Sequence, residues 1–528
     1  MKNKWIALVA LCFAELLVMV DNTIVNVALP TVARDLDAGI SGLQWIVDAY
    51  TLVFAGLLLT GGYLGDRFGH RRMLATGIVG FVAVSVAAAS SNTLGELIAS
   101  RAGLGMFAAL VFPATLALIV AAFTEAKDRA VAVGVWAATS GMAVAIGPVL
   151  GGWLLDHYSW SSVFWINVPF GAVALAGALL VIPAPTEQRI TLPRFDIVGV
   201  VLSIAGLGLL TYSVIEGPSV GWSSWRTIGG LVVALGIVAA FVSHQLRVEH
   251  PIFDVRLFTN RRFAGAAGMI AVAFFALFGF IFLITQFFQA VMGYSPLQAG
   301  VRTLPFALVV AALSPAAMAL SHRFGPRVVA VTGALLMASG FSVVELTDRD
   351  STYFGLIIWS MMLMAAGLAM ISGPCTQVIM DALTPEQAGA GSAINDTTRE
   401  IGGTLGVAVL GSVLTSVYAA NVGVRLQDLG VPQPAREIAE QSVMAGVQVA
   451  MRAPQQAAEA VHAAVADVFI DGLQQATWVA VVISVCSAVA GGWAMRRRAS
   501  HDDDRLESGE TVAAEVNQTA TAELSPLA

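Results

Sequence analysis

Residues 62–72 read GYLGDRFGHRR, and this loop lies between two long hydrophobic stretches near the start of the chain. Its charges are expensive inside hydrocarbon, so we expect the loop at a membrane surface. A partial copy, RFGPR, occupies residues 323–327 and repeats residues 67–71 with one mismatch. Both copies lie in short loops between apolar runs. This favours an internal duplication over a chance repeat, and duplicated helix bundles are a common way to build a membrane carrier.

The composition around this loop excludes an ordinary soluble domain. Hydrophobic residues make up 57% of the chain and charged residues 12%, and the mean hydropathy is +0.78. Such values indicate an integral membrane protein. A hydrocarbon core ~30 Å thick is crossed by about 20 residues of α-helix. The chain is therefore expected to be an all-α membrane protein.

Fourteen apolar runs have the length of a membrane span. They lie near residues 5–29, 43–65, 73–91, 95–122, 131–153, 163–183, 197–215, 226–246, 263–290, 299–320, 327–346, 354–380, 399–419 and 473–495. With the repeat, they predict two six-helix bundles, residues 1–183 and 263–498, and two additional helices within residues 184–262. Residues 420–472 are predicted to form a long external loop, with helical spacing at residues 435–444. The acidic tail, residues 499–528, is predicted to be disordered.

Basic residues indicate the orientation, because cytoplasmic loops retain Lys and Arg during insertion. With the N-terminus inside, the cytoplasmic side holds most of them, including the arginines of both loop copies and the run at residues 496–498. The short external loops hold only Arg34, Arg226, Arg302 and Arg349. An even number of spans then places both termini in the cytoplasm.

Several motifs, in order along the chain, resemble the fourteen-helix drug:proton antiporter branch of the major facilitator superfamily. Besides the loop at residues 62–72, they are DNTIVNVALP at residues 21–30, Arg101 with Gly105, GPVLGG at residues 147–152 and NDTTREIGGTLG at residues 395–406. The family often has Trp-Arg before its sixth helix, whereas this chain has Trp160 followed by Ser161. The resemblance implies multidrug efflux, antibiotic resistance and location in the bacterial plasma (inner) membrane.

The loop is a candidate cytoplasmic gate made of Gly62, Asp66, Arg67, Gly69, Arg71 and Arg72. A carboxylate at residue 66 could bind the positive end of a helix or an arginine, and the two glycines would permit close backbone approach. Alternating access needs two arrangements separated by a few kcal/mol, so a breakable charge network suits a latch. For Arg71 and Arg72, a role in topology alone is an equal alternative.

The motif at residues 147–152 places Gly147, Pro148, Gly151 and Gly152 in the fifth span. Small residues let helices approach closely, and proline bends a helix. The family resemblance implies that this motif serves export. Plain helix packing is compatible with the same residues.

Ionisable residues inside the spans are costly and usually functional. Asp21, Asp48 and Arg101 lie at similar depths, ~8 to 13 Å from the external helix ends by helix rise. We expect them to share a polar cavity in which protonation of a carboxylate changes its pairing with the arginine. The resemblance favours Asp21 as the proton carrier and Arg101 as its modulator, while Asp48 carries a proton or attracts a cationic substrate. A static buried ion pair is the alternative, and Glu15 is given no role.

The candidate substrate-binding residues are Asn22, Asn26, Gln286 and Gln289, polar groups expected between the two halves. No Gly-rich phosphate loop or His-Glu-x-x-His motif is present, and the Gly-x-Ser-x-Gly match at residues 217–221 lies between two predicted spans and not at a strand-to-helix turn. We therefore expect a secondary carrier and no enzyme, cofactor or metal. Its expected partners are a small molecule, protons and the lipid bilayer, without nucleic acid, and a monomer is expected.

The residues leave several functions open. An exporter of an endogenous metabolite, lipid or siderophore would share every motif, and a passive channel is a further, less favoured class. Protons are preferred over sodium because the resembled branch uses them.

Overall fold

The computed structural model describes residues 4–182, 195–249, 251–383 and 388–496. Within these ranges the chain is helical, and fourteen helices are long and apolar enough to cross a membrane. The fourteen-span prediction is confirmed. The predicted disordered tail at residues 499–528 lies outside the described residues.

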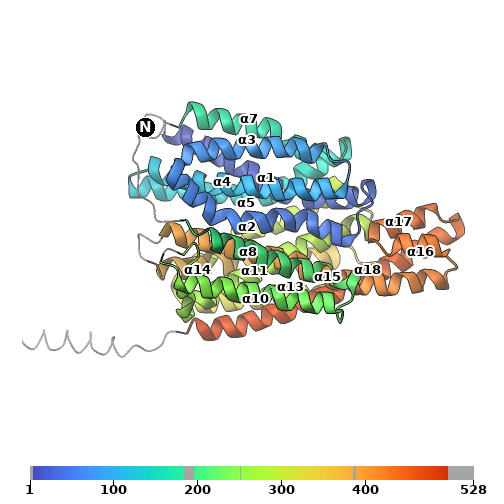
Figure 1. The fold of residues 1–528 in the computed structure, drawn as a ribbon. Helices are drawn as coiled ribbons and strands as arrows, with labels where there is room; N and C mark the ends of the chain where they lie inside the picture. The colour runs from blue at the N-terminus through green and yellow to red at the C-terminus, as the bar shows by residue number, and fades with distance from the viewer. Residues whose placement is uncertain (1–3, 183–194, 250, 384–387, 497–528) are drawn as a thin grey trace, which may run out of the picture.

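The helices of each region follow one another with short connections (Figure 1). The first half contains α1 (Lys4–Asp35), α2 (Ile40–Phe68), α3 (His70–Ala89), α4 (Leu94–Ala122), α5 (Ala126–His157), α6 (Ser162–Trp165) and α7 (Asn167–Leu180). The middle region contains α8 (Ile197–Ile215), α9 (Gly217–Val220), α10 (Trp225–Arg247) and the 3₁₀-helix η1 (Val255–Thr259). The second half contains α11 (Arg261–Gln286), η2 (Phe287–Val291), α12 (Pro296–Phe324), α13 (Pro326–Val344), η3 (Tyr353–Ile357), α14 (Ile358–Asp381), α15 (Ala388–Asp428), α16 (Gln433–Ala439), α17 (Val443–Arg452) and α18 (Gln455–Ala494).

The repeated loop has the same backbone geometry in both halves. Gly69 joins α2 to α3 with φ 93°, and Gly325 joins α12 to α13 with φ 84°. Each glycine N–H donates to the carbonyl four residues earlier, at 2.8 Å in the first copy and 2.9 Å in the second. A positive φ favours glycine because it lacks a Cβ. The shared Phe-Gly step therefore reflects one turn used twice.

The two halves pack through α2 against α15 and α5 against α12. In the first contact, Gln44 Nε2 donates to the carbonyls of Val407, at 3.0 Å, and Ala408, at 2.9 Å. In the second, a side chain at Gly300 would collide with the Pro148 carbonyl. The absence of side chains at such points allows the helix backbones to meet.

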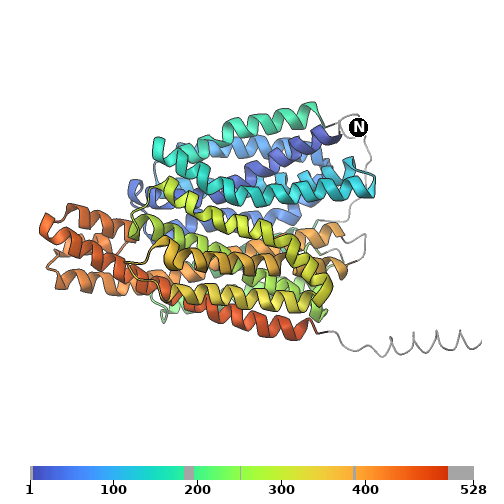
Figure 2. The same ribbon diagram turned by 180° about the vertical axis from the view of Figure 1, so that it is seen from behind.

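The two additional helices, α8 and α10, pack on each other, and α8 lies against α2 and α15. Ser412 Oγ of α15 donates to the carbonyl of Val214 in α8 at 2.8 Å. These helices follow the flank of the bundle (Figures 1 and 2). Much of α10 is exposed in the isolated chain, as expected of a lipid-facing helix.

The segment predicted as a long external loop is mostly helical. α15 continues to Asp428 and α18 begins at Gln455, so both helices extend beyond the predicted spans. With α16 and α17 they project from the bundle at the end away from the N-terminus (Figure 1). Residues 440–442 separate α16 from α17 and interrupt the single helical segment suggested by the spacing of residues 435–444. The carbonyl of Gln441 there accepts a hydrogen bond from Ile40 N–H at 3.1 Å.

Candidate functional site

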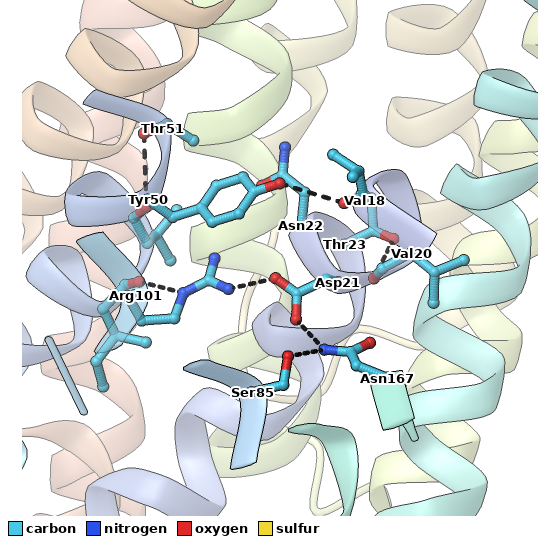
Figure 3. Close-up of polar contacts among 12 residues, drawn as sticks. Val18, Val20, Asp21, Asn22, Thr23, Tyr50, Thr51, Ser85, Arg101 and Asn167 are labelled. Atoms are coloured by element: carbon cyan, nitrogen blue, oxygen red, sulfur yellow. Dashed lines mark hydrogen bonds and ion pairs between the residues drawn. The ribbon is translucent and has the colours of Figure 1, made fainter. Parts of the chain in front are cut away.

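A buried ion pair joins α1 to α4 in the first half. Arg101 Nη1 lies 2.7 Å from Asp21 Oδ2, and both side chains are 0% exposed. Asp21 lies just past the middle of α1, whereas Arg101 lies two turns into α4. Both predicted residues therefore meet, on different helices, as Figure 3 shows.

The other contacts of the Arg101 guanidinium are to residues of α2. Nε donates to the carbonyl of Ile46 at 2.9 Å, and Cζ lies 4.3 Å from the centre of the Tyr50 ring. Tyr50 in turn donates its hydroxyl proton to the carbonyl of Val18 at 3.3 Å. Nη2 has no hydrogen-bond partner within the described parts of the chain. The guanidinium thus retains one donor that could serve a second acceptor.

An amide completes the site from a third helix. Asn167 Nδ2 at the start of α7 donates to Asp21 Oδ1 at 2.6 Å and to Ser85 Oγ of α3 at 3.1 Å (Figure 3). Both carboxylate oxygens of Asp21 therefore have partners. Sequence reasoning missed Asn167 and Ser85, although a polar amide within the apolar run after Trp165 was an available signal.

Asp48 lies on another face of α2. Its neighbours on that face, Gln44 and Thr51, bond to α15: Thr404 Oγ1 lies 2.9 Å from Thr51 Oγ1. Ile46 and Tyr50, by contrast, face Arg101. Asp48 is 0% exposed, and neither of its carboxyl oxygens has a hydrogen-bond partner among the described residues. The structure unites two members of the predicted triad and puts the third at the interface between the halves.

A second group of intramembrane charges lies on α15 and was missed. Arg399 Nη1 is 3.5 Å from Asp396 Oδ1, and Arg399 Nη2 donates to Thr376 Oγ1 of α14 at 3.2 Å. Glu400 Oε2 has no partner within the described ranges. The predicted span begins at residue 399 and therefore places these charges at its boundary. Because α15 begins at Ala388, they lie several turns inside the helix.

Glu15 is also buried, and its Oε1 accepts a hydrogen bond from Ser140 Oγ of α5. Its Oε2 has no partner in the described residues. The side chain faces a different helix from Asp21, as the six-residue spacing indicated.

The prediction of a loop at residues 62–72 is wrong in extent, because residues 62–68 are the last turns of α2, residues 70–72 begin α3, and only Gly69 lies between them. The contacts of this segment are local. Asp66 Oδ1 lies 3.0 Å from His70 Nε2, and Arg67 Nη1 donates to the Tyr63 hydroxyl at 3.1 Å. The expected close approach at Gly62 is wrong, because a Cβ there would meet nothing within 4 Å. Close packing instead occurs at Gly65, where a side chain would overlap the His70 ring.

The two final arginines of this loop differ. Arg71 donates from Nε to the carbonyl of Ala178 at 3.2 Å and from Nη2 to that of Leu179 at 2.6 Å. It therefore caps the last carbonyls of α7. Arg72 is exposed. A purely topological role fits Arg72 better than Arg71.

The glycines of residues 147–152 face two different helices. Side chains at Gly147 and Gly151 would overlap Thr23 and Ile24 of α1. A side chain at Gly152 would overlap the start of α12 at residues 296–297. The motif therefore lets α5 approach both the helix of Asp21 and the opposite half.

The polar residues proposed to bind substrate lie near the junction of α1 with α11 and η2. Gln289 Nε2 donates to the carbonyl of Val27 at 2.9 Å, across the two halves. Asn26 Nδ2 bonds to the carbonyl of Asn22 at 3.2 Å. The side-chain oxygens of Asn22 and Gln286 are buried without a partner among the described residues. The four residues thus share a region. The side-chain amides of Gln289 and Asn26, however, already donate hydrogen bonds to backbone carbonyls.

Fourteen helices of membrane-spanning length within the described residues, with a completely buried ion pair between two of them, indicate a polytopic membrane transporter. Residues 11–407 match the Major Facilitator Superfamily, and the chain belongs to this family.

Its relatives include named drug-efflux proteins. The multidrug resistance protein Stp of Mycobacterium tuberculosis is 36% identical over 433 residues, which cover 82% of this chain and 80% of that protein. The multidrug efflux pump LfrA of Mycolicibacterium smegmatis is 34% identical, with 94% and 97% covered. The methyl viologen resistance protein SmvA of Salmonella typhimurium is 35% identical, with 89% and 94% covered.

Solved structures agree on the fold. A bacterial homologue of the human lysosomal transporter Spinster, in an inward-facing conformation, superposes with a TM-score of 0.64 over 94% of this chain and 99% of that one. The sequence identity is 17%, so the likeness concerns the fold alone.

Proposed function

We propose that the protein is a proton-coupled exporter of small lipophilic or cationic compounds, with Asp21 as its proton carrier. The observation that carries the proposal is the fully buried Asp21–Arg101 pair that joins α1 to α4. Breaking a buried pair by removing one charge costs about 3–5 kcal/mol in proteins. A change of that size is ample to shift an equilibrium between two transporter states.

Protonation of Asp21 would neutralise one partner and release Arg101 from α1. The guanidinium would keep its bond to the Ile46 carbonyl and its contact with Tyr50, so it would stay with α2 and α4. α1 would keep its hydrogen bonds to Tyr50 and Asn167 but would lose its ion pair to α4. It could then move with α5, because Thr23 Oγ1 of α1 donates to the Ala143 carbonyl of α5 at 3.1 Å. Because α5 also packs on α12 through Gly152, proton binding would reach the interface between the halves.

The closed end of this interface is the end opposite the chain termini. α1 begins and α18 ends at one end of the bundle (Figure 1). Because consecutive spans run in opposite directions, Gly152, near the end of α5, and Gly300, near the start of α12, lie toward the other end. We infer that the termini are cytoplasmic in a bacterial plasma membrane, as basic-residue placement favours. The structure would then represent a state closed to the outside.

The names of the relatives support export of drug-like molecules. They include proteins for resistance to puromycin in Streptomyces alboniger and to methyl viologen in Salmonella typhimurium. The unpartnered carboxyl oxygens of Asp48 and Glu400 would favour a positive charge within the bundle. The unpartnered oxygens of Asn22 and Gln286 could accept hydrogen bonds from a bound compound.

Inverted membrane vesicles with an internal acid load and a pH-sensitive dye test the proposal. Adding methyl viologen or puromycin should release protons from vesicles that contain the wild-type protein and leave control vesicles unchanged. Substrate movement without proton movement, or flux that only dissipates a gradient, would instead indicate a uniporter or channel.

A further inference from the structure

A cavity lies outside the proposed transport site, where α15 and α18 pass beyond the end of α13. It has a volume of about 360 Å³. Its lining consists of Glu345, Val417, Asn421, Arg425, Val468, Asp471, Gln474, Gln475 and Trp478. The volume lies within the range of small-molecule sites in proteins.

An exposed stripe on α18 shows the depth of this cavity in the membrane. Trp478, Val482, Val485, Val489 and Trp493 recur at helical spacing, and all are 39–70% exposed. The stripe spans ~22 Å between its two tryptophans by helix rise. Tryptophan concentrates at membrane interfaces, so we infer that Trp478, at the end of the stripe beside the cavity, lies near the level of the headgroups.

The cavity begins where this apolar stripe ends. Asp471, Gln474 and Gln475 lie one to two turns before Trp478, on the same face of α18. The lining therefore changes from apolar to polar along one helix face at the depth of the lipid headgroups.

The cavity is lined by charged side chains of both signs, and two of them are free to bind a ligand. Arg425 and Asp471 are exposed, and neither forms an ion pair with any residue that the structure describes. Glu345 is partly buried, with Oε1 accepting from Thr477 Oγ1 at 2.9 Å. Burial raises the pKa of the Glu345 carboxyl, so a neighbouring cation would stabilise its charged form.

We propose that this cavity binds the phosphoethanolamine headgroup of a membrane phospholipid. Arg425 would bind the phosphate, for which a guanidinium has suitable geometry. The carboxylates of Asp471 and Glu345 would accept hydrogen bonds from the primary ammonium. Trp478 would lie at the level of the glycerol backbone, and the acyl chains would follow the α18 stripe.

Binding of short-chain phosphatidylethanolamine to the delipidated, full-length protein in detergent tests the site. A fluorescent form of the lipid reports affinity, and unlabelled competitors report selectivity. Short-chain phosphatidylcholine, whose quaternary amine has no N–H donor, should compete about tenfold less well, the factor that about 1.4 kcal/mol produces. Equal competition by the two lipids would overturn the proposal.

Two variants and two matched controls locate the site. Arg425→Gln and Asp471→Asn should each weaken binding about tenfold, whereas Arg452→Gln on α17 and Glu459→Gln on α18 should leave it unchanged. All four variants must unfold at the same temperature as the wild-type protein, so that a loss of binding is not a loss of fold. Unchanged binding by both cavity variants would overturn the assignment.

Soluble O-phosphoethanolamine distinguishes a lipid from a free metabolite. It should compete at least tenfold less well than the lipid, because it lacks the acyl chains that would contact α18. Equal competition would overturn a lipid site. These assays need no proton gradient, so their outcome is independent of the proposed transport activity.

Discussion

Two charge clusters within the membrane, one in each half, differ in what they connect. Asp21 and Arg101 come from separate helices and are completely buried, with Asn167 bridging to a third. Asp396 and Arg399 lie three residues apart on α15, with side chains 17% and 28% exposed. A change of charge at the first cluster can alter how helices pack, whereas the pair on α15 can break without separating two helices. Coupling is therefore expected in the first half and recognition of charge in the second.

Asp21→Asn should have the largest effect. The amide keeps the shape of the side chain but cannot carry a proton, so proton-driven export should be abolished while insertion is retained. Proton release in inverted vesicles measures the effect, and Glu15→Gln is the isosteric control for loss of a buried carboxyl on the same helix. Full coupling in Asp21→Asn would remove this residue from the mechanism.

Arg101→Lys separates charge from geometry. An ammonium cannot bond Asp21 and the Ile46 carbonyl in the arrangement that the guanidinium fork allows. The rate of export should fall about tenfold, which corresponds to about 1.4 kcal/mol. Arg399→Lys is the matched change on α15 and should change the rate much less. Similar losses in the two variants would contradict the distinction between the clusters.

Gly300→Ala probes the interface through which the first cluster is proposed to act. The added methyl group would push against the Pro148 carbonyl, and overpacking of this kind costs about 1–3 kcal/mol. Export should fall several-fold because the closed arrangement is disfavoured. Gly141→Ala on α5 is the control, since a Cβ there meets nothing within 4 Å. Transport rates of both variants at equal expression provide the measurement.

Glu400→Gln tests recognition by the second cluster. Removing one carboxylate should raise the apparent KM for dicationic methyl viologen about fivefold, equivalent to about 1 kcal/mol. The proton count per transported molecule should stay the same. A changed number of protons per transported molecule, with an unchanged KM, would assign Glu400 to proton coupling instead.

Asp196 offers a reference outside the spans, with the smallest expected effect on transport. Burial acts to raise the pKa of its carboxyl, but hydrogen bonds from His244, the Gly199 amide and Gln245 outweigh it and hold this pKa below its ordinary value. The stabilisation is therefore present above pH about 4 and is lost as the pH falls through the lowered pKa. Thermal unfolding in detergent should show a steeper acid loss in wild type than in Asp196→Asn. Identical acid dependence would exclude a stabilising role.

Sequence reasoning located the spans and the residues of the ion pair, because hydropathy and helix rise report depth. It could not report the direction of each side chain around its helix. Asp48 has nearly the same depth as Asp21 but lies on the α2 face directed at α15. The charges of α15 were missed for a related reason, since hydropathy detects the apolar centre of a helix and not its polar continuation.

The hydrogen bond from Ile40 to the Gln441 carbonyl has a practical consequence. It ties the helical appendage formed around α16 and α17 to the first turn of α2 in the other half, so separation of the halves at this end must break it. A camelid antibody fragment that binds α16, α17 and the start of α2 together could stabilise this contact. Such a reagent would arrest the cycle without entering the bilayer or competing for the cargo.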